Sequence, residues 1–122
     1  MEIINKVIQL EWEMFQRVNN MGGRANCQDD FVTFEIMRKS QFLSWDHTVV
    51  KIYLNDLIDA KRNHRNLLTE KYLIMMKSTD PDYYYQNESM LIPLSNERIN
   101  QQEEIISIEI EWAEAYCIKY PL

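Results

Sequence analysis

Two charged side chains stand in the middle of apolar series that have helical spacing. Glu11 lies midway along the first series, which consists of Ile4, Val7, Phe15 and Val18. Arg38 has the same place in the second series, which consists of Phe31, Phe34, Phe42 and Trp45. Because residues three and four apart share one face of a helix, both charges are expected to project from buried faces.

Glu109 is a third charge of this kind, and its apolar neighbours along the helix are Ile105, Trp112 and Tyr116. Burying any one of these ions without a partner costs on the order of several kcal/mol. We therefore predict that Arg38 contacts Glu11, Glu109 or both. Two interpretations stay open: a structural ion pair that sets the register of the helices, or a polar pocket for a small ligand, a cation or a proton-transfer centre.

A polar segment that contains both glycines separates the first two series. It reads Gly22-Gly23-Arg24-Ala25-Asn26-Cys27-Gln28-Asp29-Asp30. Such a density of reactive groups on a connection between helices is typical of a binding site. Six of its residues are therefore candidate binding residues: Arg24, Asn26, Cys27, Gln28, Asp29 and Asp30. The alternative is structural: a glycine ends the first helix, the acids cap the second, and Cys27 is a small packing residue.

Several kinds of active site lack their required partners in this sequence. A nucleophilic Cys27 needs a nearby base, and neither His47 nor His64 has a spacing that places it there. Carboxylates are available as metal ligands, but no Glu-x-x-His or His-x-x-x-His pair accompanies them. No phosphate-binding glycine loop is present either. We predict neither a metal nor a cofactor.

Helical periodicity dominates the chain, and no alternation typical of strands competes with it. We predict an all-α fold, with a single domain over residues 1–122 built as a bundle of about five helices. The expected helices are 2–19, one from Asp29 or Asp30 to about 45, one from Asp46 to the basic tract 61–65, 67–77, and a last one from Ser95, with a short helical turn at 82–87. The second helix is apolar on two faces and is expected to be central.

Composition and charge narrow the possible functions. The chain has 122 residues, is 46% apolar and carries a net charge of −6, which disfavours binding to nucleic acid or to an anionic membrane. Its two cysteines lie far apart, no secretion signal is visible, and no apolar run is long enough to span a membrane. We therefore expect a soluble, cytoplasmic protein, and we interpret the basic tract 61–65 as a solvated helix end.

The sequence resembles a bacterial family of domains of unknown function, DUF4125. The residues that carry the resemblance are Leu10-Glu11-Trp12-Glu13, the segment from Gly22 to Asp30, Thr33-Phe34, Ile36 to Phe42, Trp45, Arg65-Asn66-Leu67, Glu70-Lys71-Tyr72, Met75-Met76 and Lys119-Tyr120-Pro121. The resemblance implies a stand-alone cytoplasmic bacterial domain, and it implies no particular activity, cofactor or partner. Its motif positions include Glu11, Arg38, Gln41 and the six polar residues of the glycine segment.

Three functional hypotheses follow. The first is a small ligand-binding or regulatory protein whose polar pocket lies where Glu11 and Arg38 meet the glycine segment. The second is a small enzyme of the hydrolase or transferase type, in which Glu11 or Glu109 acts as general base and Arg38 holds an anionic substrate group. The third is a protein interaction module that uses the acidic last helix or the tyrosine segment from Tyr83. The partner is therefore a small molecule or a protein, and the oligomeric state is left open.

Overall fold

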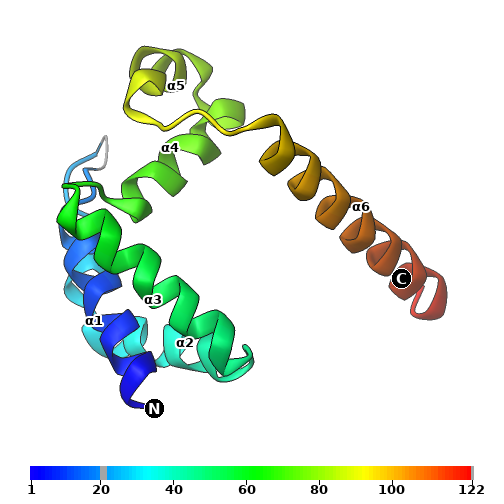
Figure 1. The fold of residues 1–122 in the computed structure, drawn as a ribbon, viewed down its shortest axis with the longest axis horizontal. Helices are drawn as coiled ribbons and strands as arrows, with labels where there is room; N and C mark the ends of the chain where they lie inside the picture. Colours follow the sequence, from blue (N-terminus) through cyan, green and yellow to red (C-terminus); the bar gives the residue numbers. More distant parts are fainter. Residues whose placement is uncertain (20–21, 122) are drawn as a thin grey trace. The chain divides into compact units, whose positions relative to one another are not determined.

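All regular structure in the computed structural model is helical over the described residues, 1–19 and 22–121 (Figure 1). The α-helices are α1 (Glu2–Gln16), α2 (Phe31–Leu43), α3 (His47–Arg62), α4 (Leu67–Thr79), α5 (Pro81–Asn87) and α6 (Asn96–Lys119). Two 3-10 turns accompany them, η1 (Asn26–Asp29) and η2 (Glu88–Met90). The predicted all-α class is confirmed. The described residues form six α-helices rather than about five, because the short turn expected at 82–87 is the helix α5.

The chain divides into two compact units. The first, Met1–Met90, contains α1 to α5, and the second, Leu91–Leu122, contains α6. The single domain over residues 1–122 stays a prediction. Within the described part of the chain, no helix has both the length and the apolar character needed to cross a lipid bilayer.

Polar side chains start five of the helices at the positions that the sequence indicates. Each accepts a hydrogen bond from a backbone N–H in the first turn, which would otherwise have no partner. These caps are Asp30 for α2, Asp46 for α3, Asn66 for α4, Asp80 for α5 and Ser95 for α6. Pro81 follows its cap at the first helical position, where its missing N–H costs nothing. The predicted helix starts are therefore confirmed.

The end of the first helix differs from the prediction. It ends at Gln16 rather than at residue 19, because the N–H groups of Arg17 and Val18 bond three residues back, to Met14 and Phe15, and tighten the chain. Asn20, which we expected to help end this helix, lies outside the described residues. The glycines do not cap it. Gly23 does adopt the left-handed conformation, with φ of 89°, but within the following loop.

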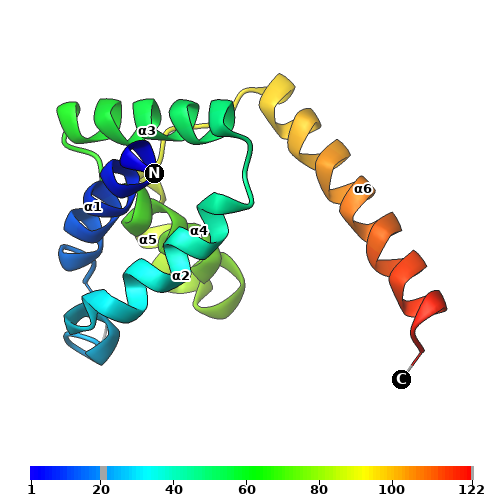
Figure 2. The same ribbon diagram turned by 90° about the horizontal axis from the view of Figure 1, so that it is seen from below.

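The core of the first unit forms around α1, which contacts α2, α3 and α4 (Figure 2). Its predicted inward stripe is buried from end to end, and Glu11 is buried with it. Phe34 of α2 stacks on Phe15 at a centroid separation of 5.4 Å. The centre of the Trp12 ring lies 5.2 Å from the centre of the Phe34 ring. The expectation that α2 is the central helix is wrong, since only Phe42 of α2 is buried. Its second predicted apolar face, which consists of Val32, Ile36 and Leu43, is exposed.

Candidate functional site

The predicted contact between Arg38 and Glu11 is present and joins α2 to α1. The Arg38 guanidinium donates from Nε to Glu11 Oε1 at 2.8 Å and from a terminal nitrogen to Oε2 at 2.9 Å. The Glu11 side chain is 3% exposed and that of Arg38 is 23% exposed. This two-point geometry is the strongest form of an arginine–carboxylate pair. Burial lowers the pKa of Arg38, but the hydrogen bond and charge of Glu11 outweigh that effect and raise it above its usual value.

A third residue, Tyr53 of α3, completes this cluster. Its hydroxyl donates a 2.6 Å hydrogen bond to Glu11 Oε2, so one carboxylate connects three helices. Burial raises the pKa of Tyr53 well above its usual value of 10, and the negative charge of Glu11 raises it further. The phenol is therefore held in its neutral, donating form. Sequence reasoning counted Tyr53 as an apolar residue of α3 and missed this bond.

The remaining polar groups around the pair are also satisfied within the protein. Arg38 donates a 2.6 Å hydrogen bond to the side chain of Gln41, and its guanidinium lies 4.6 Å from the centre of the Phe42 ring. Among the described residues, no buried side-chain nitrogen or oxygen lacks a hydrogen-bond partner. A general base must reach a substrate proton, whereas both oxygens of Glu11 are engaged inside the protein. The geometry therefore favours the structural interpretation of this pair.

Gln28 is the buried member of the glycine segment, and it closes the end of α1. Its amide nitrogen donates to the carbonyl oxygens of Phe15 and Val18, at 2.8 and 3.1 Å, and its oxygen accepts from the Ala25 N–H at 2.8 Å. The last carbonyls of a helix have no partner in the helix itself. Gln28 supplies one, which gives this residue a clear structural task.

The other candidates in this segment lie on its surface. Arg24 pairs with Asp29 at 2.8 Å and also donates to the side chain of Gln16 and the carbonyl of Gln28. Asp30 caps α2, and its hydrogen bonds from Thr33 lower its pKa. Asn26 and Cys27 are exposed, so the expectation that Cys27 is a packing residue is wrong. The structure places these residues along one loop, held by bonds to each other and to α1.

Glu109 belongs to α6, in the second unit. It is exposed there, as are the apolar residues of its stripe, Ile105, Trp112 and Tyr116. Its predicted contact with Arg38 and its part in a shared site stay predictions. So does the use of the acidic last helix as an interaction surface.

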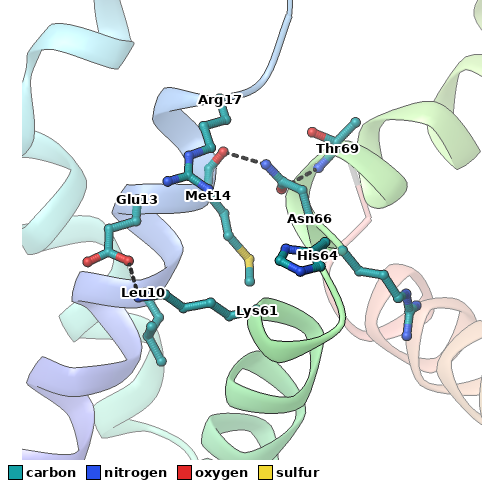
Figure 3. Close-up of a pocket in the computed structure, with 9 residues that line it drawn as sticks. Leu10, Glu13, Met14, Arg17, Lys61, His64, Asn66 and Thr69 are labelled. Atoms are coloured by element: carbon teal, nitrogen blue, oxygen red, sulfur yellow. Dashed lines mark hydrogen bonds and ion pairs between the residues drawn. The ribbon is translucent and has the colours of Figure 1, made fainter.

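A cleft of about 270 Å³ opens between α1, the end of α3 and the start of α4 (Figure 3). It lies entirely within the first unit, and sequence reasoning missed it. Its walls are Leu10, Glu13, Met14, Arg17, Lys61, His64, Arg65, Asn66 and Thr69. Four of these nine side chains are basic, although the whole chain carries a net charge of −6. The basic tract interpreted as a solvated helix end thus forms one wall of a cleft.

Two of these bases form ion pairs, and a third forms none within the described part of the chain. Lys61 lies 3.0 Å from Glu13, and Arg65 pairs with Glu70 at 2.7 Å. The hydrogen bond to Glu70 raises the pKa of Arg65, so the guanidinium stays charged. Arg17 makes no ion pair with any described residue. The cleft therefore keeps an excess of positive charge.

His64 reaches the cleft through an unusual backbone conformation. It has φ of 58°, the left-handed region in which glycine is normally found. The surrounding bonds are those of a Schellman turn: the Arg65 N–H donates to the Ala60 carbonyl at 2.8 Å, and the His64 N–H to that of Lys61 at 3.2 Å. A side chain here costs roughly 1 kcal/mol relative to glycine. The chain thus has an imidazole at a position where glycine would adopt the backbone conformation with less strain.

Asn66 fixes the two sides of the cleft relative to each other. Its side-chain oxygen accepts from the N–H groups of Leu68 and Thr69, at 3.1 and 3.0 Å, and so begins α4. Its amide nitrogen donates a 2.8 Å hydrogen bond to the carbonyl oxygen of Met14 on α1 (Figure 3). One signal in the sequence, four bases within 61–65 followed by a helix cap, marked this region. It did not reveal that α1 lies opposite.

The fold and these two clusters define a small all-α protein in which α1 holds a closed ion-pair network on one side and a basic cleft on another. The chain belongs to the family described as protein of unknown function (DUF4125), whose model matches residues 1–122. The resemblance in the sequence is therefore confirmed over the whole chain. No curated protein and no solved structure matches this chain.

Proposed function

We propose that this protein is a small-ligand-binding protein whose ligand is an anion held in the basic cleft. The single observation that carries this proposal is the gathering of Arg17, Lys61, His64 and Arg65 around one cleft of a strongly acidic chain. The ligand-binding hypothesis is kept, but the proposed site moves from Arg38 to the cleft at the C-terminal end of α3. The closed hydrogen bonds of Glu11 and Arg38 support that move.

The charges favour an anion because the cations outnumber the carboxylates. Three permanent cations line the cleft, against one lining carboxylate, Glu13, and a second carboxylate, Glu70, that pairs with Arg65. Arginine and lysine side chains bind carboxylate and phosphate groups through charge-assisted hydrogen bonds. A bound anion would gain Arg17, and it would compete with Glu13 for Lys61.

The volume and the overall charge favour a small ligand over a polymer. A cleft of about 270 Å³ lies just below the usual size of small-molecule pockets, roughly 300–1,000 Å³. Nucleic acid would meet the repulsion of a chain with net charge −6 outside the cleft.

We further propose a cytoplasmic, bacterial setting. The free and exposed thiols of Cys27 and Cys117 support a reducing compartment.

Thermal denaturation in the presence of simple anions tests this proposal. Inorganic phosphate, pyrophosphate and a dicarboxylate, each compared with chloride at equal ionic strength, are expected to raise the melting temperature saturably. Arg17→Gln and Lys61→Gln should each weaken the fitted affinity about tenfold, since a charge-assisted hydrogen bond is worth roughly 1.5–3 kcal/mol.

The matched control is Arg62→Gln. Arg62 is the exposed neighbour of Lys61 and does not line the cleft. Its replacement by glutamine changes the net charge by the same amount as each cleft variant. The proposal predicts that Arg62→Gln binds like the wild type. It fails if no anion gives a saturable shift, or if the control loses as much affinity as the two cleft variants.

A further inference from the structure

Two mainly apolar hollows adjoin the basic cleft along α4, and together they are called the groove. Two adjoining hollows, of about 50 and 480 Å³, share the lining residues Val18, Asn19, Tyr72, Met76 and Tyr83. The smaller hollow also shares Thr69 with the basic cleft. The three hollows therefore follow one another on the same side of α4, all within the first unit.

The sequence of α4 explains why its residues line the three hollows in succession. Thr69, Tyr72, Met76 and Thr79 are spaced three, four and three residues apart, so they form a stripe on one helix face. From Thr69 to Thr79 this stripe is roughly 15 Å long, at the helical rise of about 1.5 Å per residue. One end of the stripe therefore meets the cations, and the other end lies among methionine and tyrosine side chains.

The character of the lining changes along this path. At the basic end the walls carry Arg17, Lys61 and Arg65, whereas the larger hollow is lined by Val18, Tyr72, Met75, Met76 and Tyr83, beside a few uncharged polar groups. None of the residues lining either hollow beyond Thr69 is charged. Methionine side chains are flexible and polarizable, and they adapt to apolar ligands of varied shape. Such a surface fits a chain or ring of a ligand, and the cations fit its head.

We infer that the ligand is an amphiphile: an anionic head bound by Arg17, Lys61 and Arg65, with an apolar tail lying along Tyr72 and Met76. This inference rests on the proposed anion site and names the class of its ligand. Two observations select this occupant over a purely apolar one. The groove adjoins the basic cleft at the shared wall residue Thr69, and positive charge is present at one end only.

Isothermal titration with three probes separates the head from the tail. Inorganic phosphate reports the head alone, octyl glucoside the tail alone, and octyl phosphate both, all below the concentration at which the detergents form micelles. Octyl phosphate is expected to bind at least tenfold more tightly than inorganic phosphate, because the apolar chain leaves water on binding. Octyl glucoside is expected to bind more weakly than octyl phosphate by a similar factor.

A pair of matched variants tests the place of the tail. Met75 lines the groove and Ile74, its neighbour on α4, does not, although the two residues are equally exposed, at 56% and 55%. Met75→Glu should abolish the advantage of octyl phosphate over inorganic phosphate, and Ile74→Glu should leave it unchanged. Because both positions are exposed, neither variant removes a core residue, and circular dichroism checks their folding.

The outcomes for head and tail are distinguishable. If inorganic phosphate binds and octyl phosphate binds no more tightly, the amphiphile inference is overturned and the anion site stands. If Ile74→Glu loses as much as Met75→Glu, the tail does not lie in this groove and the inference is again overturned. If neither phosphate compound binds, the anion site itself is wrong and the inference falls with it.

Discussion

Arg38 on α2 donates two hydrogen bonds, of 2.8 and 2.9 Å, to the carboxylate of Glu11 on α1, and this carboxylate is almost completely buried. A third bond from Tyr53 brings α3 to the same carboxylate. Three helices of the first unit, α1, α2 and α3, are thus connected through a single carboxylate. This network is fully used in holding the fold, which is why the basic cleft, and not this pair, carries the proposed function.

Removing one member of the pair should cost more than removing both. Arg38→Met is expected to lower the free energy of unfolding by about 3 kcal/mol, because it leaves Glu11 buried without its cation. The double variant Glu11→Leu with Arg38→Met should recover a large part of that loss, and urea denaturation measures both. A double variant less stable than Arg38→Met would contradict the structural role. Anion-dependent stabilisation should persist in Arg38→Met, since Arg38 does not line the cleft.

Tyr53 should make the protein sensitive to alkaline pH. The pKa of its phenol is raised in the folded state, so the folded protein holds this proton more tightly than the unfolded chain, whose value is near 10. Its contribution is therefore fully present below about pH 10 and is lost as the pH rises beyond that value. Tyr53→Phe is expected to cost about 1 kcal/mol at neutral pH, the net worth of one hydrogen bond.

The difference between wild type and Tyr53→Phe, measured by urea denaturation at pH 7 and at pH 11, isolates this residue from the other groups that titrate there. The two proteins should converge at the higher pH. A constant difference between them would show that the hydroxyl does not titrate as argued.

Gln28 should matter for stability although it was predicted as a ligand-binding residue. Gln28→Ala removes the donor to the Phe15 and Val18 carbonyls and the acceptor of the Ala25 N–H. A loss of about 2–3 kcal/mol is expected, because buried groups are left without partners. The neighbouring exposed variant Asn26→Ala is the control and should change stability by less than about 0.5 kcal/mol. Equal losses of unfolding free energy in the two variants would contradict a structural role specific to Gln28.

His64 should oppose stability and support binding. His64→Gly relieves the left-handed backbone conformation and is expected to stabilise the fold by up to about 1 kcal/mol. If the imidazole contacts the anion, the same variant should bind phosphate several-fold more weakly. His64→Asn, which tolerates this conformation but lacks the ring, separates the two effects. A His64→Gly protein that binds phosphate as the wild type does would exclude the imidazole from the site.

The sequence alone predicted the features that depend on local periodicity. The phase of α1 placed Glu11 inward correctly because an apolar stripe on an isolated helix has one interpretation. Caps such as Asp46 and Asn66 were predictable because the side chain bonds its own backbone two or three residues on. The contact from Arg38 to Glu11 followed from the cost of burying either charge alone.

Other features depend on how distant segments meet, and the sequence did not reveal them. The basic cleft needs α1 and the turn at His64 to face each other, a relationship made by Asn66 and the Met14 carbonyl rather than by any motif. Tyr53 was counted as apolar because it falls on the apolar stripe of α3. Its ring does pack with Phe42 and Trp45, but its hydroxyl bonds Glu11 on α1, a contact that spacing along α3 cannot show. Gln28, thirteen residues after Phe15, bonds the carbonyls at the early end of α1, a contact that the spacing of one helix cannot show.

Amide chemical shifts followed during a titration with inorganic phosphate test the central claim most directly, because they report each residue separately. Saturable shifts at Arg17 and across residues 61–69, with small shifts at Gln28 and Arg38, are the predicted result. Shifts that never saturate, or that centre on residues 24–30 and Arg38, would contradict the assignment of anion binding to the basic cleft.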